Sequence, residues 1–366
     1  MTLSRRLFLG AACSAAASPL MTPVTLAAAP GESRLVVILL RGAMDGLSVV
    51  RPVFDPSFAA LRPDETDGPD LGAGWRLHPE LAPLAGEVAA VHAVSTPYGS
   101  GRSHFDGQDV LETGALVGGA SGGWLGRLAG LMPDSELRTV FAVGAAAPLI
   151  VRGPAPVAVW DPGLDLALPE QTRRLFSLVQ GTDALFSGAA ERALDLAARE
   201  REAEGVDAAA YAAEQLRADT RIATFSIGGW DTHAGQARTL RRPLRQLVAA
   251  VEALRTGLGP LWDRTAVLAL TEFGRTARMN GTRGTDHGTG GAMLMMGGAV
   301  RAGEVHGQWP GLAEEMLLER RDLRPTADLR APVAGVIEAM FPVARADLTG
   351  TVFPGLGEVS GAGLLR

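Results

Sequence analysis

Cysteine is almost absent from this chain of 366 residues, because its single thiol belongs to Cys13. That residue lies in an amino-terminal segment that we expect to be removed, so the mature protein would contain no thiol. Disulfide bonds, thiolate metal ligands, iron–sulfur clusters and a cysteine nucleophile are therefore excluded. Any metal ion must be held by carboxylates and imidazoles, a donor set that suits zinc, manganese, magnesium or calcium.

A long apolar run is also missing from the amino-terminal segment. The stretch after Arg5 and Arg6 is too short and too rich in alanine and serine to span a bilayer stably. Paired arginines before such a stretch are typical of a twin-arginine export signal, and Ala27–Ala29 supply a cleavage site. We therefore predict a signal peptide over residues 1–29 and a mature domain over 30–366, exported by the twin-arginine translocase to the periplasm or the medium. The alternative is an uncleaved membrane anchor.

No basic stripe occurs along the chain. Removal of the signal, which holds two arginines and no acids, would change the net charge from −6 to about −8. Nucleic acid is therefore not an expected partner. A composition of 47% hydrophobic and 20% charged residues is typical of a globular protein, and the mature length is sufficient for one large domain.

What the chain does contain is a set of short apolar runs that end in glycine or polar residues. Such runs are typical of buried parallel strands that carry functional groups at their carboxyl ends. Alanine-rich stretches with helical spacing lie between them, which predicts an α/β fold: a mostly parallel sheet covered by helices on both faces. Residues 118–188, broken by proline and glycine, are predicted to form a small insertion or cap. The predicted strands are 35–40, 88–94, 222–227 and 266–270, and the predicted helices are 189–217 and 243–258.

Three imidazole–carboxylate pairs lie in loops beside the predicted strands. A single pair of this kind often forms only a turn hydrogen bond, but three of them at strand ends indicate a metal site. Asp45, after the first strand, adds a further carboxylate. The pairs are His104 with Asp106, Asp231 with His233, and Asp286 with His287.

The sequence resembles the family catalogued as domain of unknown function 1501, which is assigned to the alkaline-phosphatase-like superfamily together with sulfatases and phosphopentomutases. The resemblance covers nearly the whole chain and depends on seven motifs taken together. The motifs are Arg41–Leu47, Arg102–Phe105, Gly123–Arg127, Gly228–His233, Glu272–Thr276, Gly284–Gly288 and Trp309–Leu312.

The resemblance implies an alkaline-phosphatase-like fold that binds one or two divalent metal ions. It also implies a serine nucleophile, which corresponds here to Ser103. His306 corresponds to a terminal ligand, or is a histidine of a surface loop. The other ligands that the resemblance implies are Asp45, Asp231 and His233 for one metal, and Asp286 and His287 for the second.

Three further residues are candidates for catalysis. Arg102 is placed to neutralise the charge of an oxyanion. His104 is a metal ligand, a proton donor to a leaving group, or a packed histidine that holds its loop. Glu272 ligates metal or acts as a base, or else it pairs with Arg275 one turn further on.

Two classes of function follow. The first is an exported metal-dependent hydrolase of small phosphate or sulfate esters, in which cations about 4 Å apart clamp the oxyanion of an in-line displacement. The alternative is a non-catalytic exported protein with the same fold that binds metal or acts in assembly. A transferase or mutase using the same site is a third interpretation. The resemblance also suggests a partner from a neighbouring uncharacterised family.

Overall fold

The computed structural model describes residues 32–99, 101–116, 118–132, 140–143, 147–155, 157–160 and 208–366. The predicted signal peptide lies outside the described residues, as do residues 161–188 of the predicted cap and residues 189–207 of the first predicted helix. Within the described part of the chain, no helix is long and apolar enough to cross a membrane.

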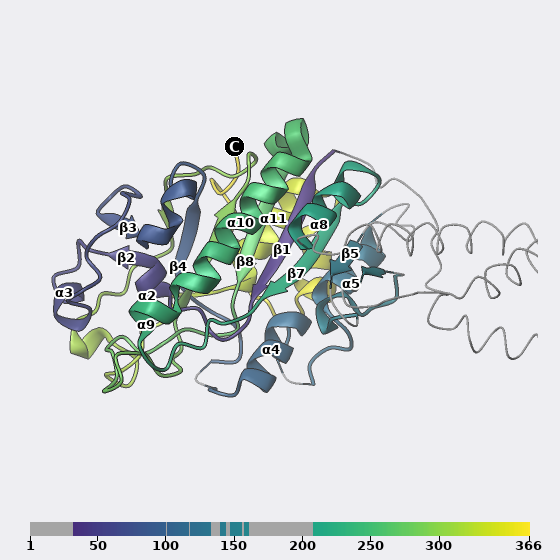
Figure 1. Cartoon of the computed structure of the whole chain (residues 1–366). Helices are drawn as coiled ribbons and strands as arrows, with labels where there is room; N and C mark the ends of the chain where they lie inside the picture. The colour runs from purple at the N-terminus through teal and green to yellow at the C-terminus, as the bar shows by residue number, and fades with distance from the viewer. Residues whose placement is uncertain are drawn as a thin grey trace, which may run out of the picture.

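A nine-stranded sheet forms the centre of the protein (Figure 1). Its strands are β1 (Arg34–Leu40), β4 (Ala89–Ser95), β5 (Val140–Val143), β6 (Ala158–Trp160), β7 (Ile222–Ile227), β8 (Thr265–Leu270), β9 (Gly291–Met296), β10 (Val305–His306) and β11 (Ala327–Asp328). The order is β10-β4-β9-β8-β1-β7-β5-β6, and β11 also pairs with β4. Among these strands only β9 is antiparallel to its neighbours, β4 and β8. The predicted α/β class with a mostly parallel sheet is confirmed.

The central strand β1 shows why the sheet is buried on both faces. It pairs in parallel with β7 on one side and β8 on the other, and all seven of its residues are buried. Successive side chains of a strand point to opposite faces. Val36 and Ile38 therefore join one hydrophobic core, while Leu35 and Val37 join the core on the other face.

Helices cover both faces of the sheet, as Figure 1 shows with α8 and α10 in front and α11 behind. α8 (Ala208–Arg217) and α10 (Arg241–Leu258) supply apolar side chains to the first core. α5 (Trp124–Leu131) and α11 (Arg330–Met340) supply them to the second. α10 begins two residues before the helix predicted at 243–258.

The remaining elements are short, apart from α4 with its ten residues. Strands β2 and β3 form a separate antiparallel pair. The elements are α2 (Gly46–Val49), β2 (Val50–Pro52), α3 (Phe58–Leu61), β3 (Trp75–Leu77), η1 (Pro79–Leu84), α4 (His104–Thr113), η2 (Leu149–Val151), α9 (Gln236–Thr239), η3 (Gly259–Arg264), η4 (Glu314–Met316), α12 (Arg345–Asp347) and η5 (Leu348–Val352).

Two strands within the stretch predicted as an insertion or cap belong to the main sheet. β5 pairs with β7, and β6 pairs with β5, both in parallel. These strands have only four and three residues, too few to show a periodic pattern amid proline and glycine. Residues 161–188 lie outside the described part of the chain. A separate cap with these boundaries therefore stays a prediction.

The direction of the strands brings distant loops to one edge of the sheet. The carboxyl ends of the parallel strands β1, β4, β7 and β8 all face this edge. Because β9 runs the opposite way, the loop that precedes it, residues 284–290, reaches the same edge. The loops that follow β1, β4 and β7 and the single connection between β8 and β9 therefore meet there, as is typical of the carboxyl edge of a parallel sheet.

Candidate metal centre

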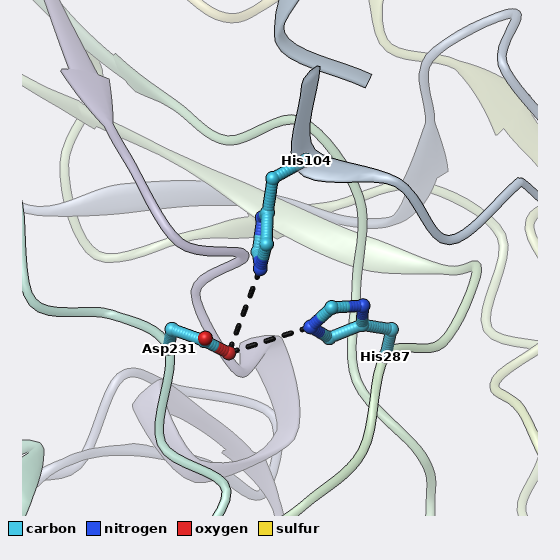
Figure 2. Close-up of side chains that lie close together, drawn as sticks. All are labelled: His104, Asp231 and His287. Carbon is cyan, nitrogen blue, oxygen red and sulfur yellow. Dashed lines mark hydrogen bonds and ion pairs between the residues drawn. The ribbon is translucent and has the colours of Figure 1, made fainter. Parts of the chain in front are cut away.

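Three side chains converge at this edge: His104, Asp231 and His287 (Figure 2). His104 is the first residue of α4, Asp231 lies in the loop after β7, and His287 lies in the loop before β9. Each offers one ligand atom, and these atoms all lie within 4.8 Å of one another. Among the residues that the structure describes, it is the one group of three or more histidine, cysteine, aspartate or glutamate side chains that lie close enough to hold a metal ion.

Two glycines let the loops of the site approach each other closely. Gly42 has a φ of +117°, and a Cβ there would lie 2.6 Å from the backbone nitrogen of Asp231. A Cβ at Gly284 would lie 2.2 Å from the carbonyl of His233. A larger residue at either position would push the loops apart, so the site depends on these glycines.

The imidazole of His104 is oriented by the buried carboxylate of Glu272. Glu272 Oε1 lies 2.8 Å from His104 Nδ1 and also accepts a hydrogen bond from the backbone nitrogen of Gly42 at 2.9 Å. The bond to Glu272 raises the pKa of His104. Burial acts to raise the pKa of Glu272, but hydrogen bonds, above all that from His104, lower it overall. His104 Nε2 is buried and has no hydrogen-bond partner among the described residues.

The imidazole of His287 and that of a further side chain, His233, are held in the same way, through Nδ1. His287 Nδ1 lies 2.8 Å from the carbonyl oxygen of Arg102, and His233 Nδ1 lies 3.3 Å from Asp286 Oδ1. An oxygen acceptor at Nδ1 keeps the proton on that nitrogen and leaves a lone pair on Nε2. Burial lowers the pKa of His287, which favours its neutral form.

The three Nε2 atoms therefore face a single carboxylate oxygen, Asp231 Oδ1. It lies 3.0 Å from Nε2 of His233, 3.4 Å from that of His287 and 3.6 Å from that of His104. The Nε2 atoms of His233 and His287 are themselves 3.0 Å apart. The nitrogen lone pairs and the negatively charged carboxylate oxygen repel one another unless a cation lies between them. The residues present fit a divalent ion with nitrogen and oxygen ligands.

Asp231 is fixed by the fully buried Arg275. One guanidinium nitrogen donates to Asp231 Oδ1 at 2.5 Å and to the carbonyl of Gly42 at 2.6 Å, and Nε donates to the carbonyl of Ala43. Burial acts to raise the pKa of Asp231, but the bond and charge of Arg275 outweigh it, and the pKa is lowered. The carboxylate therefore stays ionised, as a metal ligand must.

The structure does not bring Asp45 into this group. Its carboxylate is buried, lies 2.9 Å from the guanidinium of Arg62, and accepts a bond from the Gln236 amide at 2.6 Å. It also caps α2 by accepting from backbone nitrogens. Burial acts to raise the pKa of Asp45, but Arg62 lowers it overall. The protein itself thus satisfies this carboxylate with hydrogen bonds and a counter-ion.

His306 also lies outside the group. It belongs to β10 at the sheet edge, where it pairs with Val91 of β4, five strand positions from β7, which precedes Asp231. Its Nε2 lies 3.6 Å from Glu304 Oε2, and burial lowers its pKa. Asp286 is adjacent to the group, and its carboxylate hydrogen-bonds to Nδ1 of His233, the ring nitrogen that does not face Asp231.

Ser103 and Arg102 lie beside the centre but make other contacts. The Ser103 hydroxyl caps α4 by accepting from the backbone nitrogen of Asp106 at 3.5 Å. The Arg102 guanidinium lies 3.4 Å from Glu319 and 3.6 Å from Asp322. The carbonyl of Arg102, rather than its charge, touches the group.

Sequence reasoning missed the polar residues behind the centre. The Gln236 amide oxygen accepts from the hydroxyls of Thr232 and Thr285, each at 2.7 Å, while its nitrogen donates to Asp45. It therefore joins the loop that carries Asp231 to the loop that carries His287. Its place three residues after the Gly228–His233 motif was the only signal available.

These features define an α/β protein with a histidine–carboxylate centre at the carboxyl edge of a mostly parallel sheet. A model of the family described as "Protein of unknown function (DUF1501)" matches residues 164–341. The match includes the motifs at 228–233, 272–276, 284–288 and 309–312, and it confirms the resemblance over that part of the chain.

Similar solved structures are distant. A protein in the alkaline phosphatase superfamily from Vibrio parahaemolyticus is 12% identical, with a TM-score of 0.32, and the alignment covers 74% of this chain and 62% of that one. The protein Ps i-CgsB is 11% identical, with a TM-score of 0.33 and coverages of 75% and 68%. The PH0037 protein from Pyrococcus horikoshii is 12% identical, with a TM-score of 0.30 and coverages of 76% and 88%. No curated protein matches the chain.

Proposed function

We propose that this protein is an exported, metal-dependent hydrolase of phosphate or sulfate esters. The observation that carries the proposal is the convergence of three imidazole Nε2 atoms on Asp231 Oδ1. The Asp231 and His233 side chains are 45% and 44% exposed, so a substrate can reach the centre from solvent.

The donor set best suits zinc. Three protein ligands, His104, Asp231 and His287, leave a position open for substrate, as catalytic zinc sites do. When bound, the ion would polarise the ester and lower the pKa of the attacking hydroxyl. Manganese, magnesium and calcium prefer more oxygen ligands than this group offers.

The protein's own residues would divide the remaining work. Glu272 holds the proton of His104 on Nδ1, and Arg275 balances the charge of Asp231. Ser103 is one residue before His104 at the start of the ten-residue α4, where the helix dipole favours a developing oxyanion. Its oxygen would attack phosphorus or sulfur as the ester bond breaks. His233, the most exposed of the three imidazoles, would take the Ser103 proton on the lone pair of Nε2 and give it to the leaving oxygen. Water would then release the phosphate or sulfate from Ser103.

Export is part of the proposal. The paired arginines ahead of a short apolar stretch support transport of the folded protein by the twin-arginine translocase. A protein that acquires its metal before export avoids competition from tighter-binding ions outside the cell. A fusion of residues 1–31 to a reporter enzyme tests this proposal. Loss of reporter export when both Arg5 and Arg6 are replaced by lysine is expected, and unchanged export would contradict it.

Metal analysis and turnover test the site. The exported protein is assayed for bound metal and for hydrolysis of an aryl phosphate and an aryl sulfate. We expect His287→Asn to lose both metal and turnover, and Ser103→Ala to lose turnover while keeping metal. His306→Asn is the matched control and should keep both. Metal content and turnover that survive in His287→Asn would refute the site.

A non-catalytic metal-binding protein is the second candidate, because one observation favours it. His233 Nε2 lies 3.0 Å from both Asp231 Oδ1 and His287 Nε2, so it could serve as a fourth ligand. Four protein ligands are typical of closed, structural zinc sites. One tightly held ion per chain without turnover of either ester would support this candidate.

A further inference from the structure

A cavity of about 680 Å³ lies beside the metal centre, between α3 and the segment 312–321. Its apolar lining includes Leu61, Leu312 and Leu317, which are buried side chains of one small hydrophobic cluster. This volume lies within the range of pockets that bind small organic molecules. The cavity can therefore hold an apolar group larger than the ester itself.

One imidazole separates the cavity from the centre. Asp286 lines the cavity and lies 3.3 Å from His233 Nδ1, while Nε2 of the same ring lies 3.0 Å from Asp231 Oδ1. The Asp286 side chain is 52% exposed. Two side chains that are about half exposed to solvent, His233 and Asp286, thus lie between the centre and the cavity, and one extended molecule would reach both sites across them.

Three arginines and two acids, Asp286 and Glu314, line the cavity wall. Arg321 pairs with the buried Asp322 at 2.9 Å, and Arg320 lies 3.9 Å from Glu314. Arg278 is exposed and has no ion-pair partner among the described residues. Arginine offers a planar set of donors that matches carboxylate and phosphate oxygens. Arg278 and Arg320, which lack a close ion pair within the described part of the chain, are therefore the lining residues that can bind an anionic group.

The backbone places Arg320 at the cavity in a conformation that side chains disfavour. Glu319 and Arg320 have φ values of 53° and 54°, and the backbone nitrogen of Arg321 donates to the carbonyl of Leu318 at 3.1 Å. Positive φ at both central positions defines a turn in which asparagine and glycine are preferred. Strained residues of this kind cluster at binding and catalytic sites.

From these features we propose that the cavity binds the leaving part of the substrate, with Arg278 and Arg320 holding a second anionic group. The substrate class is a phosphate or sulfate ester whose alcohol combines an apolar body with a carboxylate or a further phosphate or sulfate. The inference that this alcohol belongs to the substrate rests on the proposed hydrolase function. The inference that the cavity binds the alcohol does not rest on that function.

Binding of the alcohol alone tests the cavity without turnover. The probes are a hydroxybiphenyl carboxylate and its methyl ester, titrated calorimetrically into the full exported protein. We expect the acid to bind the wild type and to bind the Arg278→Ala/Arg320→Ala double variant at least about tenfold more weakly. The methyl ester should bind both proteins equally. Arg301→Ala, which removes an exposed arginine outside the cavity, is the matched control and should bind the acid like the wild type.

Arg320→Gly separates recognition from folding, because glycine accepts the positive φ. This variant should unfold at a temperature no lower than the wild type, yet bind the acid more weakly. Equal binding of the acid to the wild type and the double variant, or no binding to the wild type, overturns the proposal.

Turnover distinguishes failure of the cavity from failure of the proposed function. The substrates are the phosphate and the sulfate esters of the hydroxybiphenyl carboxylate. A higher KM in the double variant, with kcat kept, supports the whole proposal. Binding that follows the two arginines without any ester hydrolysis keeps the cavity but refutes the hydrolase. Hydrolysis with a KM that the arginines do not affect refutes the cavity and keeps the hydrolase.

Discussion

The substitution Glu272→Gln tests how the buried carboxylate controls the proposed metal centre. Glutamine has the same shape, and its amide oxygen can take the place of Oε1, which accepts bonds from His104, Gly42 and Gln108. Its amide nitrogen would then face the hydroxyl of Thr271, which is 3.0 Å from Oε2 and can accept a hydrogen bond. The change therefore removes the charge and leaves the packing in place.

The expected loss is in metal affinity rather than in folding. Charge-assisted hydrogen bonds contribute about 1.5–3 kcal/mol, and carboxylates that orient a metal-binding histidine typically change affinity by about 10- to 100-fold. We therefore expect zinc to bind about 10- to 100-fold more weakly, which is about 1.4–2.7 kcal/mol. The free energy of unfolding without metal should change by less than about 1 kcal/mol, because the substitution removes a buried charge without leaving a polar atom unsatisfied.

A competition titration against a zinc chelator measures the affinity, and urea unfolding of the metal-free protein measures the stability. Glu65→Gln is the matched control, since Glu65 is also buried but bonds Ser48 and Arg62 instead of an imidazole. A zinc affinity for Glu272→Gln within a factor of about two of the wild type, or equal to that of Glu65→Gln, would refute the reasoning.

Three more predictions follow from the same structure. Arg62→Leu leaves the buried Asp45 without its counter-ion and should lower the free energy of unfolding, measured in urea, by about 3–5 kcal/mol. The Asp45→Asn protein should keep its bound metal. Loss of metal from this variant would show that the Asp45 carboxylate is a ligand. Burial lowers the pKa of His92 from 6.5 to about 4, so the unfolded chain binds the extra proton between these values. The neutral His92 therefore contributes about 3 kcal/mol to the free energy of unfolding above about pH 6.5. This contribution is lost as the pH falls towards 4. Urea unfolding at several pH values should therefore show a smaller loss in His92→Gln, and identical pH profiles would be the contrary result. Chelation of the metal should lower the unfolding temperature of the wild type but not of His287→Asn, as measured by calorimetry, and an equal decrease in both would contradict the proposed ligand.

The strands of the core were predictable because their signal is local. Leu35–Leu40 and Ile222–Ile227 are continuous apolar runs that end at glycine-containing motifs, and such runs are typical of strands buried on both faces. β9, which reads Gly-Ala-Met-Leu-Met-Met, was not predicted as a strand. Its antiparallel direction is not visible in a run of apolar residues, because direction depends on the path of the chain through the sheet.

The partners within the candidate site were less predictable than its members. The sequence placed His104 beside Asp106 and Asp286 beside His287, but Asp106 is exposed and His104 bonds Glu272, 168 positions away. Asp286 bonds His233 rather than its neighbour. A contact between residues close in sequence needs no fold, whereas these contacts exist only when loops after separate strands meet.

The sequence alone determined the α/β class and the family resemblance, because short apolar runs and motifs are properties of the chain itself. The tertiary structure decided which acids face the centre and which are neutralised inside the protein. Asp45 and Asp231 both follow strands in glycine-containing motifs, yet Arg62 takes the first into a buried ion pair and Arg275 holds the second toward three imidazoles. The cost of burying a charge without a partner makes that choice, and only the folded arrangement of the arginines reveals it.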